Sequence, residues 1–145
     1  MSRRIDLGEH FTIQELVPRE IYADFGRQAI WFLDPVAVGV LKLLRRQFGP
    51  CTVNDWKWGG EFRYSGYRQP EVDIGAPLSQ HRFGRAFDCK FENFSADQVR
   101  QNIMADEALW MAAGLTTLES GEIADTWVHF DTRPTNKDSI LIVKS

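Results

Sequence analysis

One amphipathic helix, expected from Pro35 to Phe48, constrains the fold of this chain more than any other sequence feature. Asp34 followed by Pro35 is a strong helix start, because Asp caps a first turn well and Pro fits the first helical position. The pair Gly49-Pro50 then ends the helix. Apolar residues recur between these signals at helical spacing, at Val36, Val40, Leu43, Leu44 and Phe48. A helix with one apolar face needs a partner to cover it, so we expect this segment to be the main core helix.

The other segments predict short helices and short strands. Thr12 to Glu15 and Ser95 to Gln98 have the form of capping boxes, which start helices. Helices or helical turns are expected at 12–15, 19–24, 95–104 and 106–113. Strands are expected at 51–58, 86–91, 115–118, 126–130 and 140–143, with an extended piece at 63–67 and a loop at 69–80. This order favours an α+β fold, with an antiparallel sheet flanked by helices, over alternating βαβ units.

Length and charge limit the class of protein. The 145 residues are enough for one domain, covering 1–145, that buries a core without disulfides or a metal. Hydrophobic residues at 43% and charged residues at 26% exclude a disordered chain, a fibre and a simple coiled coil. The net charge of -3 argues against nucleic acid as a partner. We find no signal segment and no membrane span, so we expect a protein made in the cytoplasm that acts outside only after release. We also expect this protein to be a monomer.

Three stretches hold the residues best suited to chemistry: SGYR (65–68), SQHRFGRAFD (79–88) and WVHFD (127–131). Imidazole nitrogens and carboxylate oxygens are good zinc ligands. Gly84 permits a turn that would put His81 on a loop and Asp88 on the following strand, while His129 lies on another strand. A His-Asp-His set leaves a fourth zinc position for water, as catalytic sites do. Taken singly, these residues are better explained as a satisfied loop histidine and a surface or capping aspartate than as metal ligands.

The full phrase is more specific than its parts. The pattern S-x-H-x-x-G-x-A-x-D, followed far downstream by W-x-H, resembles the zinc D-Ala-D-Ala carboxypeptidase and L-Ala-D-Glu endopeptidase family. That family includes bacterial cell-wall carboxypeptidases and many phage endolysins, and it shares its fold with the hedgehog signalling domain. The resemblance runs from Ser65 to Arg133, about half of the chain, and implies a hedgehog/DD-peptidase-like fold. The matching residues are Ser79, His81, Gly84, Ala86, Asp88, Trp127 and His129.

The resemblance also implies roles for individual residues. His81, Asp88 and His129 match the three ligands of a Zn²⁺ ion. Arg68 matches an arginine near the substrate carbonyl or carboxylate, where a guanidinium would stabilise negative charge on oxygen; a surface or salt-bridged arginine is the alternative. The implied substrate is a peptidoglycan peptide, cut at a bond involving a D-amino acid by a zinc metallopeptidase such as a phage or prophage lysis enzyme. The motifs do not distinguish a carboxypeptidase from an endopeptidase.

The chain departs from the family at the general base. Several members carry Asp or Glu three residues before the last histidine, a position held here by Thr126, whose hydroxyl does not replace a carboxylate near neutral pH. Asp125 is the nearest carboxylate in sequence, although four extended residues span about 13 Å. Glu119 would lie beside the last histidine if the strand candidates at 115–118 and 126–130 form a hairpin. Glu119 and Asp125 are therefore equal candidates, and Glu122 ranks behind them.

Asp131 has two interpretations. It follows His129 by two residues and would share its face of a strand, where the carboxylate could orient the imidazole. Alternatively, Asp131 ends the strand and pairs with Arg133.

Two functional hypotheses follow. In the first, zinc lowers the pKa of a bound water, Glu119 or Asp125 accepts its proton, and Arg68 helps to hold the oxyanion of a cell-wall peptide. In the second, the domain keeps the metal but lacks a working base, and serves as a recognition or phage structural domain; Thr126 favours this reading. Hydrolysis that stops with a chelator and returns with zinc would distinguish the enzyme from the binding domain.

Overall fold

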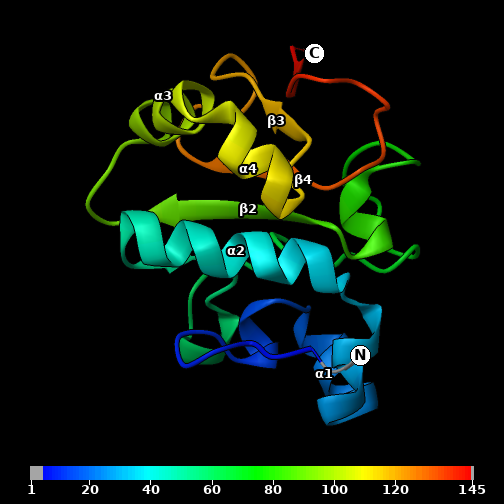
Figure 1. Cartoon of the computed structure of the whole chain (residues 1–145). Helices are drawn as coiled ribbons and strands as arrows, with labels where there is room; N and C mark the ends of the chain where they lie inside the picture. Colours follow the sequence, from blue (N-terminus) through cyan, green and yellow to red (C-terminus); the bar gives the residue numbers. More distant parts are fainter. Residues whose placement is uncertain (1–4, 145) are drawn as a thin grey trace.

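A computed structural model describes residues 5–144, shown in Figure 1. Its α-helices are α1 (Arg19–Phe25), α2 (Pro35–Phe48), α3 (Ala96–Ala105) and α4 (Glu107–Ala113). Segments of 3-10 helix occur at η1 (Ile13–Glu15), η2 (Gly26–Phe32), η3 (Trp56–Trp58) and η4 (Gln80–Phe83). The strands are β1 (Cys51–Thr52), β2 (Ala86–Phe91), β3 (Thr117–Glu119), β4 (Val128–Asp131) and β5 (Leu141–Val143). The expected α+β class is confirmed, and between residues 5 and 144 no helix is long and apolar enough to cross a membrane.

Helix α2 forms where the sequence predicts it. The Asp34 carboxylate accepts a hydrogen bond from the Val36 backbone amide at 3.3 Å, and Gly49 ends the helix with φ at 83°. Val36 itself is 48% exposed and lies beside the buried face. That face consists of Ala37, Val38, Val40, Leu41, Leu44 and Phe48. The helix is therefore the main core helix, as its apolar spacing indicates.

Both capping boxes are present. The Ser95 hydroxyl accepts from the Gln98 backbone amide at 3.1 Å, and the Gln98 side-chain oxygen accepts from the Ser95 backbone amide at 2.9 Å. At the first box, the Thr12 backbone amide donates to the Glu15 carboxylate at 2.7 Å. The first box starts only the short turn η1, whereas the second starts the ten-residue helix α3.

The sheet has the strand order β1-β2-β4-β3-β5. Neighbours are antiparallel except β3 and β5, which are parallel, so the expectation of a wholly antiparallel sheet is wrong at this edge. The reason is that the chain reverses after β4 but passes its neighbour β3 before it re-enters the sheet. Since β3 already runs opposite to β4, the returning β5 must run in the same direction as β3.

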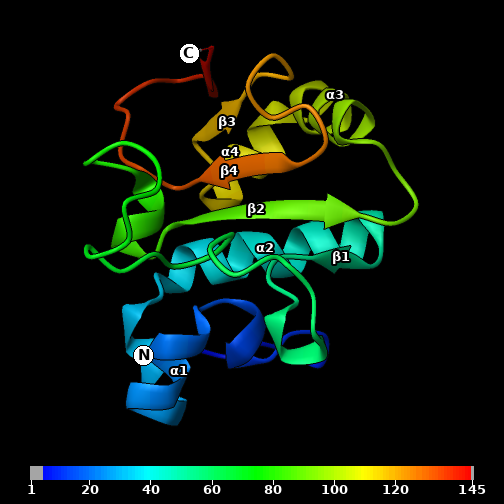
Figure 2. The ribbon, with the colours of Figure 1, turned by 180° about the vertical axis from the view of Figure 1, so that it is seen from behind.

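The two faces of the sheet differ. Side chains alternate along a strand, and one set is fully buried towards the helices: Phe87, Cys89, Leu118, Val128 and Phe130. Helix α2 packs against β2 and α3 packs against β4. The helices lie in front of the strands in Figure 1 and behind them in Figure 2. The alternate side chains, which include Asp88, Glu119 and His129, lie on the face that these helices leave open.

The strand expected at 51–58 is wrong beyond Thr52, because polar side chains there satisfy backbone groups of a loop instead of a strand ladder. The Asn54 side-chain oxygen accepts from the Ser65 amide at 2.9 Å, and the Asp55 carboxylate accepts from the Phe62 amide at 2.8 Å. These bonds hold the segment 53–65, which includes the short helix η3, outside the sheet. The extended piece expected at 63–67 is likewise no strand of the sheet.

Shortening a side chain on the buried face of α2 tests this core. Leu44 is fully buried, so Leu44→Ala is expected to lower the free energy of unfolding by about 2–5 kcal/mol, measured by urea denaturation. The control is Val36→Ala on the same helix, where the half-exposed side chain should cost much less. Equal losses at both positions would contradict the assignment of the buried face.

Candidate metal centre

Three side chains from separate elements meet on the open face of the sheet. His81 comes from η4, Asp88 from the middle of β2 and His129 from β4. One potential ligand atom from each lies within 4.8 Å of the other two. Both histidines are buried and the Asp88 side chain is 14% exposed. The three residues predicted as metal ligands are therefore brought together.

Local backbone features position these ligands. Asp88 and His129 are direct partners in the antiparallel pairing of β2 with β4, so their side chains project side by side. Gly84 ends η4 with φ at 70° and packs against the backbone of Phe32 so tightly that a Cβ would collide with the carbonyl oxygen. This glycine allows the chain to turn between His81 and β2, as the sequence pattern indicates.

The hydrogen bonds of each imidazole identify the nitrogen that faces the other ligands. His81 Nδ1 lies 2.9 Å from the Gly66 carbonyl oxygen, to which it must donate, which leaves Nε2 3.2 Å from Asp88 Oδ1. His129 Nε2 lies 2.8 Å from Asp131 Oδ2, which leaves Nδ1 3.0 Å from Asp88 Oδ1. A metal would therefore be held through His81 Nε2 and His129 Nδ1, each oriented by an oxygen behind the ring.

Asp131 fulfils both of the roles that its sequence position suggests. Its Oδ2 contacts His129 and also accepts from Arg133 Nη2 at 2.6 Å, while Oδ1 accepts from Arg133 Nε at 2.8 Å. The Asp131 side chain is fully buried. Burial would raise its pKa, but the hydrogen bonds from Arg133 and His129 lower the pKa to about 2. Asp131 is thus a carboxylate fixed by Arg133 and directed at the imidazole of His129.

The electrostatics of the site favour a cation. Burial would raise the pKa of Asp88, but the charge of His81 and the hydrogen bonds from His129 and His81 hold it well below its usual range. Burial would lower the pKa of His129, yet its hydrogen bonds to Asp131 and Asp88 raise that pKa to about 9. The buried carboxylates therefore stabilise positive charge at this point. A His-Asp-His donor set surrounded in this way fits a divalent ion such as Zn²⁺.

Arg68 and Glu119 lie at this site, whereas Asp125 does not. Arg68 Nη2 is 3.4 Å from Asp88 Oδ2 and its Nε donates to the Tyr64 carbonyl at 2.6 Å, so the salt-bridged alternative for Arg68 holds within the site itself. Glu119 Oε1 is 3.8 Å from His129 Nδ1. This contact follows from the hairpin of β3 with β4.

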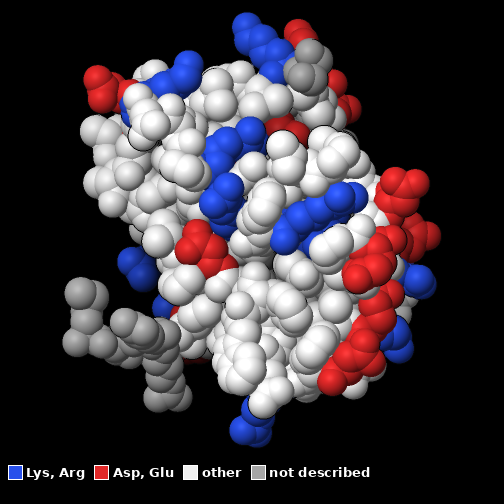
Figure 3. Space-filling view, turned by 90° about the vertical axis from the view of Figure 1, so that its right-hand side faces the viewer, with Lys and Arg blue, Asp and Glu red and all other residues white. Residues whose placement is uncertain are grey.

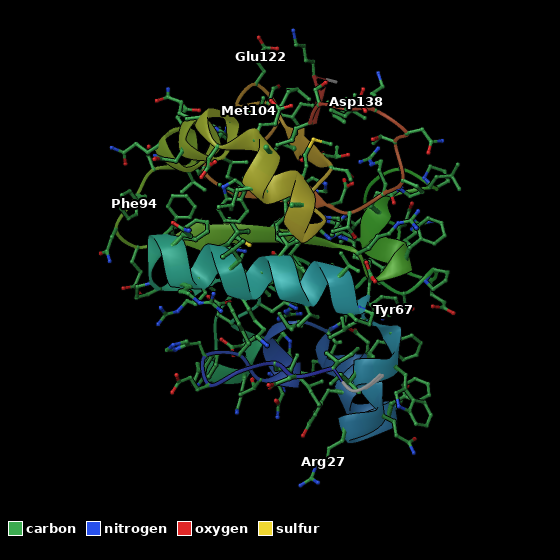
Figure 4. All side chains as sticks on the ribbon, viewed as in Figure 1. Arg27, Tyr67, Phe94, Met104, Glu122 and Asp138 are labelled. Carbon is green, nitrogen blue, oxygen red and sulfur yellow. The ribbon has the colours of Figure 1, made fainter. Side chains whose placement is uncertain are left out.

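The other two carboxylates of the β3–β4 loop face solvent. Asp125 and Glu122 are both exposed, and neither lines the cavity beside the ligands. Figure 4 shows Glu122 directed away from the body of the molecule. Of the candidates for the base, the structure therefore brings only Glu119 to the metal ligands.

A cavity of about 380 Å³ lies over the ligands. Its lining includes Arg68, the three ligands, Glu119, Trp127, and also Ser79 and Gln80 from the stretch 79–88. It further includes residues for which the sequence predicts no role in the site: Gly75, Ala76, Leu78, Ile123, Arg133 and Val143. These come from loops and from the edge strand, where no periodic signal marks them.

Figure 3 shows the side of the molecule to which η4 belongs, with Lys and Arg side chains across its middle and acidic side chains along one edge.

No family model, curated protein or solved structure matches this chain. The candidate metal centre is therefore described by its geometry alone.

Removing one imidazole should empty the centre. His81→Ala is expected to reduce bound zinc from about one ion per chain to background, because two ligands do not hold the ion through dialysis. Metal content by mass spectrometry measures the loss. His10→Ala, at an exposed histidine outside the cluster, is the matched control and should keep the metal. Retention of zinc by the His81 variant would contradict the ligand set.

Proposed function

We propose that this chain is a zinc-dependent peptidase that hydrolyses peptidoglycan peptides at a bond involving a D-amino acid. The observation that carries the proposal is the arrangement at the base of the cavity, where Glu119 lies 3.8 Å from the ligand atom His129 Nδ1. A three-residue ligand set with an adjacent carboxylate and guanidinium is the layout of metal-assisted hydrolysis. The substrate class comes from the motif resemblance alone, as does the hedgehog/DD-peptidase fold.

The residues take complementary roles. His81 Nε2, His129 Nδ1 and Asp88 would hold the ion, which when bound supplies Lewis acidity and lowers the pKa of a water molecule. The Glu119 carboxylate would accept the proton of that water and deliver it to the leaving amine. Arg68 would donate to the substrate oxygen that gains negative charge. The contact of Arg68 with Asp88 keeps its guanidinium beside the ligands for this purpose.

A recognition or phage structural domain of the same fold is the alternative. Its main support was Thr126, which replaces the carboxylate that several family members place before the last histidine. Thr126 is exposed, and Glu119 supplies a carboxylate from the neighbouring strand instead. This substitution by Glu119 favours the enzyme over the binding domain.

Metal dependence tests the proposal directly. Purified cell wall incubated with the protein should release new amino termini, a chelator should abolish the release, and added Zn²⁺ should restore it. The metal content must be measured as well, because two histidines and one carboxylate also suit Fe²⁺. Tight zinc binding with no turnover of any cell-wall peptide would support the recognition domain instead.

The proposed base can be tested separately from the metal. Glu119→Gln should lower kcat by about 100- to 10,000-fold while zinc content stays unchanged, since the amide cannot accept the proton. Asp125→Asn is the matched control, because it removes an exposed carboxylate from the loop after β3 and should leave kcat close to the wild-type value. Loss of activity in the Asp125 variant alone would show that Asp125, and not Glu119, is the base.

A further inference from the structure

A second cavity lies between helix α2 and the N-terminal part of the chain, away from the metal ligands. It measures about 230 Å³ and is bounded by the segment 7–11 and by Lys42, Arg45 and Arg46 of α2. Figures 1 and 2 both show the N-terminal segment on the side of α2 opposite to β2. The two cavities share no lining residue. A ligand of this second cavity therefore binds apart from the candidate metal centre.

Every charged side chain of α2 lines this cavity, and every one of them is a cation. Lys42, Arg45 and Arg46 are three and four positions apart, so they lie on one face of the helix. The helix contains no Asp or Glu that could pair with them. An exposed helix face that only meets water often alternates charges of both signs. Since the whole chain has a net charge of -3, this concentration of positive charge is a local feature.

The two guanidinium groups are available to a ligand. Neither the Arg45 nor the Arg46 side chain forms a hydrogen bond or an ion pair with another residue of the segment 5–144. Lys42 Nζ donates to the Asp6 carbonyl at 2.8 Å and lies 4.0 Å from the Asp6 carboxylate. This contact holds the ammonium group beside the N-terminal segment that forms the other wall. An ammonium group has three donor hydrogens, so Lys42 keeps donors for a ligand.

Two features of the surroundings bear on the role of these cations. Glu9 also lines the cavity, but it is exposed and forms no ion pair with a described residue, so the three cations outweigh it. The last turn of a helix favours cations, because its carboxyl end is partially negative. That effect accounts for Arg45 and Arg46 without a ligand. It does not account for Lys42 in the middle of the helix, or for the cavity that all three line.

We propose that this cavity is a binding site for a phosphate group, either as the free ion or as an ester on a small organic molecule. A phosphate offers more acceptor oxygens than a carboxylate, which suits two guanidinium groups and one ammonium group. The cavity is smaller than the roughly 300–1,000 Å³ of pockets that hold drug-sized ligands, so it fits a phosphate with a short organic part. Leu7 and Phe11 supply apolar surface for that part. The inference is independent of the proposed peptidase function.

Titration of isotope-labelled, zinc-loaded protein with inorganic phosphate tests the site, because NMR spectra show where the ion binds. The backbone amides of 8–11 and 42–46 should shift along one saturating curve. Acetate should bind more weakly at the same amides, since a carboxylate leaves one of the cationic groups without an acceptor. The absence of a saturable shift at these amides, or equal affinity for acetate, would overturn the proposal.

Variants of the two arginines test their part in binding. The double variant Arg45→Gln with Arg46→Gln should raise the Kd for phosphate about 10- to 100-fold, because hydrogen bonds from charged donors are lost. Arg45→Lys with Arg46→Lys keeps the charge and should retain part of the affinity. The matched control is Arg27→Gln, at an exposed arginine that Figure 4 shows at the edge of the molecule, and it should leave the Kd unchanged. An unchanged Kd in the double Gln variant, or an equal loss in the Arg27 variant, would overturn the site.

Two further titrations identify the source of the phosphate and separate the two cavities. Tighter binding of glycerol 3-phosphate than of inorganic phosphate would assign the site to an organic phosphate, and the reverse order would assign it to the free ion. Because the cavities share no residue, His81→Ala should leave the Kd at these amides unchanged even though it empties the metal centre. A Kd that rises in the His81 variant would place the phosphate at the metal ligands and overturn the second site.

Discussion

The contact between Asp88 and His129 across the β2–β4 ladder is the interaction on which the site depends. Antiparallel pairing sets the two residues opposite each other, on the face of the sheet that α2, α3 and α4 do not cover. A shift of one of these strands by one residue would turn its ligand away from the other and into the helical core. The same pairing buries Phe87 against Phe130 on the other face, so the packing of the core and the geometry of the ligands are set together.

Buried charge is tolerated here because it alternates in sign along a line of contacts. Asp88 lies between Arg68 and His129, and Asp131 lies between His129 and Arg133. Removing one member would leave its neighbour unpaired, which typically costs about 3–5 kcal/mol in a buried pair. The line also explains the raised pKa of His129, since two carboxylates outweigh the effect of burial on that imidazole. Such an arrangement could hold a divalent cation without reorganisation, because the oxygens behind the imidazoles already fix their orientation.

The division of the sheet into two faces separates stability from chemistry. The helical face is apolar and closed, while the open face carries the ligands, Glu119 and the cavity between them. Hydrogen bonds from side chains help to hold the loop between β3 and β4, which borders this cavity. Arg100, for example, donates from α3 to the carbonyls of Ala124 and Trp127 at 2.8 and 3.1 Å, which fixes the wall that carries Trp127. The proposed function follows from what this open face brings together.

Local signals in the sequence determined where several helices and strands of this protein form. Contacts between distant segments decided the remaining elements and the arrangement of the site. The caps of α2 and α3 and the bounds of β2 were predictable, because side chains cap and alternate with their near neighbours. The His81, Asp88 and His129 set was predictable only from its resemblance to a family motif, because the residue types alone favoured a loop histidine and a surface or capping aspartate. The choice of Glu119 over Asp125 as the candidate base required the register of the β3–β4 hairpin. The orientation of the Arg133 guanidinium required its pairing with Asp131. The parallel strand β5 and the loop that replaced the strand after Thr52 also depended on partners far along the chain. No local preference encodes such partners, since they exist only once the sheet has assembled.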